Sequence, residues 1–208
     1  MKKIQARDPS VFREKHGLGQ GPVIALLPGS RKQEILTMLP LMLSVVDAFK
    51  NYRFAVAAAP SQPDSLYREL CGNKEVAIVK GDTYGLLSVA EAALVTSGTA
   101  TLETALLGIP QVVCYKGGTI SYHIAKRLIK VKYISLVNLI LDRPAVTELI
   151  QHQLNPGNLI NELTAVCEGG NRRAALLSDY RLLGDQLKGE GASERTASEM
   201  LKILNETR

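Results

Sequence analysis

The stretch Ser-Gly-Thr-Ala-Thr-Leu-Glu at 97–103 combines small hydroxyl residues, a glycine and a carboxylate. It follows an apolar run, so Ser97, Gly98 and Thr99 fall at a predicted turn from a strand to a helix. Hydroxyl groups and backbone N–H groups at the start of a helix are suited to holding a phosphate. Glu103 lies four residues after Thr99 on the same helical face, where its carboxylate can accept hydrogen bonds from two vicinal ribose hydroxyls. Ordinary helix capping explains the same residues without any ligand.

A second turn of this kind follows an earlier apolar run, at Leu-Leu-Pro-Gly-Ser-Arg in 26–31. Gly29 allows a tight turn, and Ser30 is a good N-cap. Arg31 falls in the first predicted helical turn, where a cation opposes the helix dipole at a cost of about 0.3–1 kcal/mol. An arginine at this position is useful if its guanidinium binds an anion. Alternatively, Ser30 is only a cap, Glu34 balances the local charge and Arg31 is solvated.

A third polar feature is Asn138, which interrupts the apolar segment Leu-Val-Asn-Leu-Ile-Leu at 136–141. Buried amides must be hydrogen-bonded. Asn138 therefore either ties down the neighbouring turn or faces a site, and the sequence leaves both interpretations open.

Several kinds of chemistry find no support in the sequence. The three cysteines and three histidines are scattered, without a C-x-x-C or H-E-x-x-H spacing, which argues against a metal site or a disulfide framework. We recognise neither a Ser-His-Asp set nor a carboxylate pair arranged for glycoside hydrolysis. We therefore expect no metal and no cofactor, and a chain better equipped to hold a nucleotide than to activate a nucleophile.

The composition is that of an ordinary globular protein. The chain has 208 residues, of which 46% are hydrophobic and 22% charged, with a net charge of +5. A modest basic excess is compatible with a nucleotide, an anionic lipid surface or nucleic acid. No apolar run is long enough to predict a transmembrane helix, and the N-terminal residues lack the apolar core of a signal peptide. We expect a cytoplasmic protein.

Short apolar runs alternate with helix-length amphipathic stretches along the first half of the chain. The predicted strands are Val23–Leu27, Arg53–Ala58, Val76–Val79, Ala92–Val95 and Gln111–Tyr115. The predicted helices between them are Lys32–Lys50, Asp64–Cys71, Thr83–Ala90 and Thr99–Leu107. Nearly continuous hydrophobic strands indicate a sheet covered on both faces, so we predict an α/β fold with a doubly wound parallel sheet. Ligands bind such sheets at the carboxyl ends of the strands, where the two turns lie.

The second half of the chain is predicted to be mainly helical. We expect a helix over Ser121–Ile129, an extended run over 131–141, and then helices at Ala145–Gln151, Leu159–Cys167, Asn171–Lys188 and Ala192–Asn205. Around 121–134, basic residues flank an apolar stripe, and His123 is a further candidate for the site. Such a segment either lies on an anionic membrane surface or is a solvated helix face.

With these features in hand, the sequence resembles the lipid-A-disaccharide synthases, bacterial glycosyltransferases of the two-domain GT-B type. The resemblance rests on 26–31 with Glu34, and on the segments 97–116, 136–151 and 191–204. Val137 is a departure, since the family pattern has a proline before the asparagine.

The resemblance implies that the chain is the C-terminal, UDP-sugar-binding half of such an enzyme. Its domains would be a lead-in or linker over 1–20, a Rossmann-like nucleotide-sugar-binding domain over 21–190 and a C-terminal helix over 191–208. The implied reaction transfers 2,3-diacylglucosamine from UDP-2,3-diacylglucosamine to 2,3-diacylglucosamine 1-phosphate, without a metal. The N-terminal half would supply the catalytic base, so that this chain binds the donor without turnover. The resemblance further implies that the chain forms a homodimer and associates peripherally with the inner membrane, whose anionic surface would be a partner.

The resemblance also assigns roles to the residues. The implied ligands of UDP are Gly29, Ser30, Arg31, Ser97, Gly98, Thr99 and Glu103. Arg31 and Asn138 would act in catalysis, and the loop 80–86 would contact uracil through its backbone.

Two other interpretations remain open. One is a different GT-B enzyme that uses a UDP-sugar, such as a peptidoglycan glycosyltransferase or a UDP-sugar epimerase. The other is a stand-alone nucleotide- or anion-binding module whose basic segment binds membrane or nucleic acid. The transferase interpretation predicts no nucleic-acid partner, and selective binding of UDP would favour it over a nucleic-acid-binding module, whose affinity for duplex DNA would depend on salt.

Overall fold

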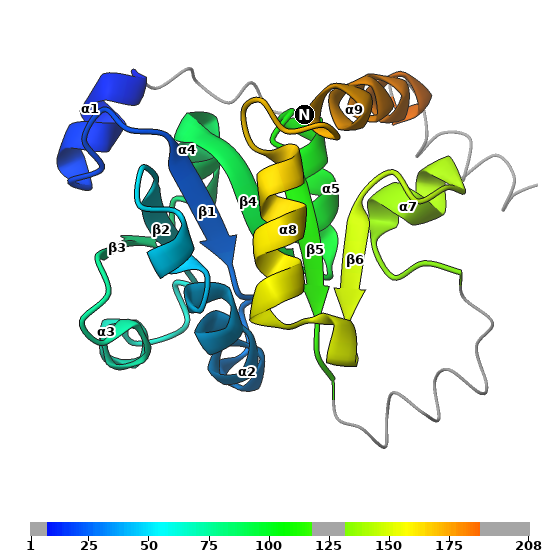
Figure 1. Cartoon of the computed structure of the whole chain (residues 1–208). Helices are drawn as coiled ribbons and strands as arrows, with labels where there is room; N and C mark the ends of the chain where they lie inside the picture. Colours follow the sequence, from blue (N-terminus) through cyan, green and yellow to red (C-terminus); the bar gives the residue numbers. More distant parts are fainter. Residues whose placement is uncertain (1–7, 118–131, 188–208) are drawn as a thin grey trace, which may run out of the picture.

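The apolar runs form one parallel sheet in the computed structural model, which describes residues 8–117 and 132–187 (Figure 1). The strands are β1 (Val23–Leu27), β2 (Arg53–Ala58), β3 (Val76–Lys80), β4 (Ala90–Thr96), β5 (Gln111–Tyr115) and β6 (Thr147–Ile150). Their order in the sheet is β3-β2-β1-β4-β5-β6, and every neighbouring pair is parallel. The five predicted strands and the doubly wound fold class are confirmed.

Helices cover both faces of this sheet (Figure 1). They are α1 (Pro9–Lys15), α2 (Lys32–Leu43), α3 (Asp64–Cys71), α4 (Thr83–Val89), α5 (Thr99–Leu106), α7 (Leu136–Leu141), α8 (Pro156–Val166) and α9 (Arg173–Leu187). Two short 3-10 helices are η1 (Val46–Ala48) and η2 (Gln151–Gln153). No helix in the described ranges is both long and apolar enough to cross a bilayer.

The central strand β1 is buried on both faces, which explains its uninterrupted apolar sequence. Its five residues are all buried, and they alternate between two hydrophobic cores. Ile24 and Leu26 belong to the core that α2, α3 and α8 cover. Ala25 and Leu27 belong to the core that α1 and α4 cover.

The direction in which successive strands are added to the sheet reverses between β1 and β4. The chain runs outward from β1 to β2 and β3, and then returns to place β4 on the other side of β1. The register pairs Leu26 with Leu94 and Leu27 with Val95, so both strands end at the same level. The turns that follow them therefore lie side by side at the switch point, where open α/β sheets bind their ligands.

Two predictions for the region between residues 131 and 151 were wrong. The segment expected to be extended contains the helix α7, and the segment expected to be helical from Ala145 contains the strand β6. Ser135 begins α7 as its N-cap, with its side chain accepting a hydrogen bond from the Asn138 N–H at 3.3 Å. The segment 136–141 has five apolar residues around Asn138. So short an apolar run fits a helix and a buried strand equally well, and periodicity cannot separate the two. Pairing with β5 decides the conformation of Thr147–Ile150.

The long helix predicted over Lys32–Lys50 ends earlier than expected. In the structure α2 stops at Leu43, three residues after Pro40, and the 3-10 helix η1 follows. Proline has no N–H to donate and weakens the helix around it. The Ser44 hydroxyl then donates to the Leu41 carbonyl at 2.6 Å and closes the last turn.

The predicted lead-in over 1–20 contains the helix α1, which packs against the domain. Phe12 is buried against α4, where a Cβ on Gly85 would lie 2.6 Å from the ring. Arg13 donates to the carbonyls of Gly21 (2.8 Å) and Val89 (3.2 Å), at the start of β1 and the end of α4. Helix α1 therefore supports α4. The helices expected over Ser121–Ile129 and Ala192–Asn205 lie outside the described residues.

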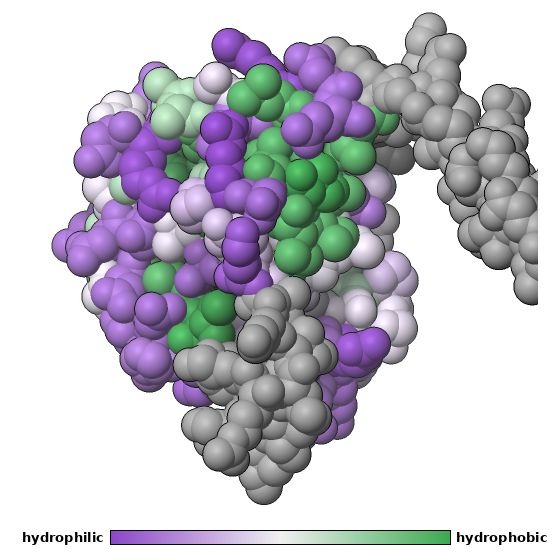
Figure 2. Space-filling model, turned by 90° about the vertical axis from the view of Figure 1, so that its right-hand side faces the viewer, coloured by the Kyte–Doolittle hydropathy of each residue, from purple (hydrophilic) through white to green (hydrophobic). Residues whose placement is uncertain are grey.

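One face of the molecule carries exposed apolar side chains around α7 and α9 (Figure 2). The exposed large apolar side chains of these two helices are Leu139 and Ile140 of α7 and Leu182 and Leu187 of α9. Apolar surface of this kind is typical of contacts with another chain or chain segment when it is contiguous.

We predict that Phe12→Ala lowers the free energy of unfolding by about 3 kcal/mol, because it leaves a cavity between α1 and α4. Urea denaturation measures this loss. Val11→Ala on the exposed side of the same helix (61% exposed) is the matched control and should change stability little. Equal stability of the two variants would contradict the packing of α1 on the domain.

Candidate functional site

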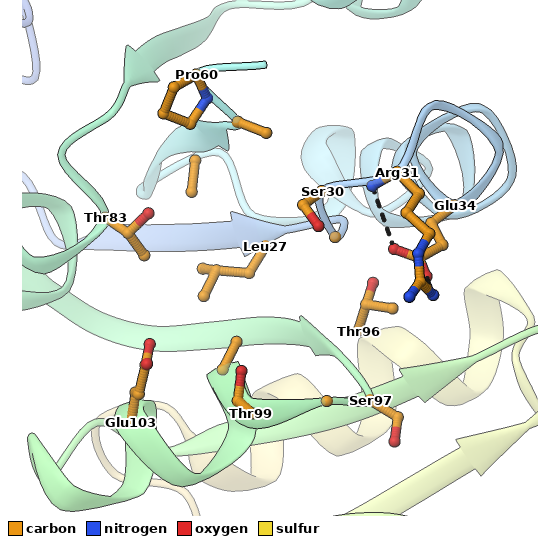
Figure 3. Close-up of a pocket in the computed structure, with 15 residues that line it drawn as sticks. Leu27, Ser30, Arg31, Glu34, Pro60, Thr83, Thr96, Ser97, Thr99 and Glu103 are labelled. Carbon is orange, nitrogen blue, oxygen red and sulfur yellow. Dashed lines mark hydrogen bonds and ion pairs between the residues drawn. The ribbon is translucent and has the colours of Figure 1, made fainter. Parts of the chain in front are cut away.

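A cavity of about 440 Å³ lies at the carboxyl ends of β1 and β4 (Figure 3). Every residue expected to bind the donor lines it: Gly29, Ser30, Arg31, Ser97, Gly98, Thr99 and Glu103. Thr83, from the loop 80–86 expected to contact uracil, also lines it. The rest of the lining was not predicted and consists of Leu27, Glu34, Ala57, Ala59, Pro60, Thr96 and Ala100. The two predicted turns thus form opposite walls of one cavity.

The first wall is the turn between β1 and α2. Gly29 has φ = +99°, in the region that favours glycine. A Cβ at this position would lie only 2.6 Å from Oε2 of Glu34. Glycine is therefore favoured at position 29 by its backbone conformation, and it leaves room for the carboxylate that lies against it.

Arg31 is the N-cap of α2 rather than a residue of its first turn, and Ser30 precedes it. The Arg31 N–H donates to Glu34 Oε2 at 3.4 Å, and Nη1 donates to Oε1 at 3.1 Å (Figure 3). This arrangement resembles a capping box with arginine as the first residue. The Arg31 side chain is 84% exposed, so its pair with Glu34 is open to water and the guanidinium is accessible to an anion that displaces the carboxylate.

The second wall is the turn between β4 and α5. Gly98 is the N-cap of α5 and no side chain caps this helix, so the first-turn N–H groups beside Thr99 remain available to a ligand. Ser97 is used differently from the prediction. Its hydroxyl donates to the Ile134 carbonyl at 3.0 Å, its N–H donates to the Cys114 carbonyl at 3.0 Å, and Figure 3 shows its side chain directed away from the cavity.

Glu103 and Thr83 lie at the other end of the cavity from Arg31 (Figure 3). Tyr84 neighbours this end and is 43% exposed. Burial raises the pKa of Tyr84, and the charge of Glu103 and a hydrogen bond with it add to the rise. The start of α4 belongs to the loop expected to contact uracil. It thus lies next to Glu103, the residue expected to bind the ribose.

Thr96 ends β4 at the wall of the cavity, directly before the predicted turn. Its Oγ1 is buried and has no hydrogen-bond partner within the described ranges. Figure 3 shows the hydroxyl directed toward Arg31 and Glu34. A buried hydroxyl without a partner is unfavourable, so this group is available to a ligand.

Asn138 lies outside the cavity lining, and its amide is used by the chain itself. Nδ2 donates to the Val146 carbonyl and to Glu148 Oε1, both at 2.9 Å, while Oδ1 accepts from the Val146 N–H at 2.8 Å. The side chain is 1% exposed. Of the two interpretations of Asn138, the structure supports the one in which it ties down the neighbouring turn. The expected direct part in catalysis is not supported by its position.

Glu148 joins this network to the cavity. Its carboxylate accepts from the N–H groups of Ile134 (3.0 Å) and Ser135 (2.9 Å), just before α7. Ser97 donates to the carbonyl of the same Ile134. The asparagine therefore positions a segment that contacts the β4–α5 turn.

The part of the chain that the structure describes holds no cluster of three or more His, Cys, Asp and Glu side chains arranged for a metal ion. His123 and the basic segment up to residue 131 fall outside this part. The positive groups that the cavity offers are Arg31 and the helix N-termini.

Solved structures that share this fold include WaaG and Alr3699/HepE. WaaG, a glycosyltransferase involved in lipopolysaccharide biosynthesis, matches with a TM-score of 0.56 and 20% identity over 91% of this chain and 50% of its own. Anabaena Alr3699/HepE, solved in complex with UDP and glucose, matches with a TM-score of 0.61 and 15% identity over 93% of this chain and 51% of its own. The chain therefore has the Rossmann-like fold that makes up about half of each of these proteins.

Sequence comparison identifies the family within this class. A model of the lipid-A-disaccharide synthetase family matches residues 1–203. The lipid-A-disaccharide synthases of Syntrophus aciditrophicus (strain SB) and Neisseria meningitidis serogroup A are each 36% identical, over 88% and 89% of this chain. The chain belongs to the lipid-A-disaccharide synthase family. It spans about half the length of these relatives, 50% and 51% respectively.

We predict that Asn138→Ala lowers the free energy of unfolding by about 1–3 kcal/mol, because it leaves the Val146 N–H and carbonyl without their partner. Thermal or urea unfolding measures the loss. Asn161→Ala, at an exposed position of α8, is the control and should be close to neutral. An Asn138→Ala protein as stable as the wild type would contradict the positioning role.

Proposed function

We propose that this chain binds the UDP moiety of a UDP-sugar in the cavity at the ends of β1 and β4, as the donor-binding half of a lipid-A-disaccharide synthase. The observation that carries the proposal is the meeting of two helix-starting turns across the switch point, with Arg31 at one end and Glu103 at the other. Family membership supports the choice of a UDP-linked acylated sugar.

The end of the cavity near Arg31 suits the diphosphate. The guanidinium can form charge-assisted hydrogen bonds with phosphate oxygens, and the uncapped start of α5 presents N–H groups and the positive end of the helix dipole. The Thr96 hydroxyl, which lacks a partner in the described ranges, adds one more hydrogen-bonding group at this end.

The end near Glu103 suits the nucleoside. A carboxylate can accept hydrogen bonds from both hydroxyls of a ribose. Thr83 and the start of α4 lie next to Glu103 and would border the uracil base.

In the proposed reaction, a 2,3-diacylglucosamine unit passes from UDP to 2,3-diacylglucosamine 1-phosphate. The 6-hydroxyl of the acceptor forms the new bond to the anomeric carbon, which gives a β-1′,6 linkage. The bond between the anomeric carbon and the diphosphate breaks, and UDP leaves with the bonding electrons. Negative charge grows on the diphosphate as the bond breaks, so fixed donors aimed at it lower the barrier. Arg31 and the start of α5 would supply this stabilisation, and the leaving group needs no general acid.

We further propose that the acceptor, and the base that takes the proton from its hydroxyl, are held by a part of the enzyme beyond this chain. The chain alone would then bind the donor without turnover. The half-length match to the relatives motivates this proposal. Acceptor and product carry acyl chains, so we also propose that the enzyme works at the cytoplasmic surface of the inner membrane.

Calorimetric titration with UDP tests the site. We expect Arg31→Ala and Glu103→Ala each to weaken UDP binding by about tenfold or more, since each removes charge-assisted hydrogen bonds. Arg53→Ala is the control and should leave the affinity unchanged. Arg53 pairs with Glu75 at the amino ends of the strands, away from the cavity at their carboxyl ends. Equal affinities in all four proteins would exclude this cavity as the UDP site.

A further inference from the structure

Glu34 accepts hydrogen bonds from two Arg31 groups that the proposed diphosphate would need as hydrogen-bond donors. One carboxylate oxygen accepts from the Arg31 backbone N–H at 3.4 Å, and the other accepts from its guanidinium at 3.1 Å. A backbone N–H at a helix start and a guanidinium are the groups that usually bind phosphate. In this structure both hold a carboxylate of the chain itself.

Three charged side chains line the described part of the cavity, namely Arg31, Glu34 and Glu103. Two carboxylates thus face a single cation, and the cation is already paired. A diphosphate entering this cavity meets net negative charge from these side chains, which opposes its binding.

The position of Glu34 depends on Gly29. The carboxylate lies where a Cβ at position 29 would stand, 2.6 Å from Oε2, so any other residue at position 29 would push it out. The pair that Glu34 forms is nevertheless open to water, with the Arg31 side chain 84% exposed and that of Glu34 35% exposed. Exposed ion pairs are weak, and a diphosphate can displace this one.

We propose that Glu34 is an internal competitor of the donor diphosphate for Arg31. It holds the guanidinium at the cavity when no nucleotide is bound, and yields it when the diphosphate arrives. This proposal rests on the proposed binding of UDP in the cavity. Its consequence is that Glu34 weakens UDP binding and favours release of UDP after transfer.

A purely orienting role for Glu34 predicts the opposite result. If Glu34 only prepared Arg31 for the phosphate, its removal would let the guanidinium move and UDP would bind more weakly. Competition predicts tighter binding after removal, so the sign of the change separates the two roles.

The test is Glu34→Gln, which keeps the size of the side chain and the pattern of a capping box but removes the charge. Calorimetric titration of the full chain should show UDP binding tightened about three- to tenfold. Binding of uridine, which has no phosphate, should not change. Glu75→Gln is the matched control, since it removes a carboxylate paired with Arg53 at the amino ends of the strands and should leave the UDP affinity unchanged.

Glu34→Ala provides a second variant should the glutamine protein fail to fold, with the same expected direction. Unchanged or weaker UDP binding in the Glu34 variants, or equal tightening in Glu75→Gln, would overturn the competition while the proposed function stands. Failure of both wild type and Glu34 variants to bind UDP would overturn the proposed function and the competition together.

Discussion

The pairing of β1 with β4 is the constraint on which the candidate site depends. These strands are far apart in sequence, yet their parallel register ends both at the same edge, with Leu27 opposite Val95. Burial on both faces fixes that register, because a shift by one residue would exchange the side chains between the two cores. The turns that begin α2 and α5 therefore face each other across a gap suited to a nucleotide.

Contacts from outside the two turns hold the second wall in place. The Ser97 hydroxyl binds the Ile134 carbonyl, and Glu148 binds the N–H of the same residue. Asn138 joins Glu148 to the backbone of Val146. Residues from β6 and α7 thus act on the β4–α5 turn through hydrogen bonds, without lining the cavity.

Local patterns were sufficient to predict the first five strands and the two turns, because buried parallel strands and the turns after them leave clear signals in a sequence. Tertiary contacts decided the rest. Ser97 was predicted to face a phosphate, but its partner is the Ile134 carbonyl, 37 residues along the chain. Residues 136–141 suit a helix or a strand until Ser135 caps them. In one interpretation of the sequence Glu34 only balances local charge. The fold adds that its carboxylate lies against Gly29 at the wall of the cavity.

We propose that the cavity between β1 and β4 holds UDP with its diphosphate toward Arg31 and its ribose toward Glu103. A crystal structure of the chain with UDP tests this most directly. We expect phosphate oxygens in contact with the Arg31 guanidinium and the first N–H groups of α5, and the ribose hydroxyls within hydrogen-bonding distance of Glu103. UDP bound elsewhere, or bound with its uracil at Arg31, would contradict the account.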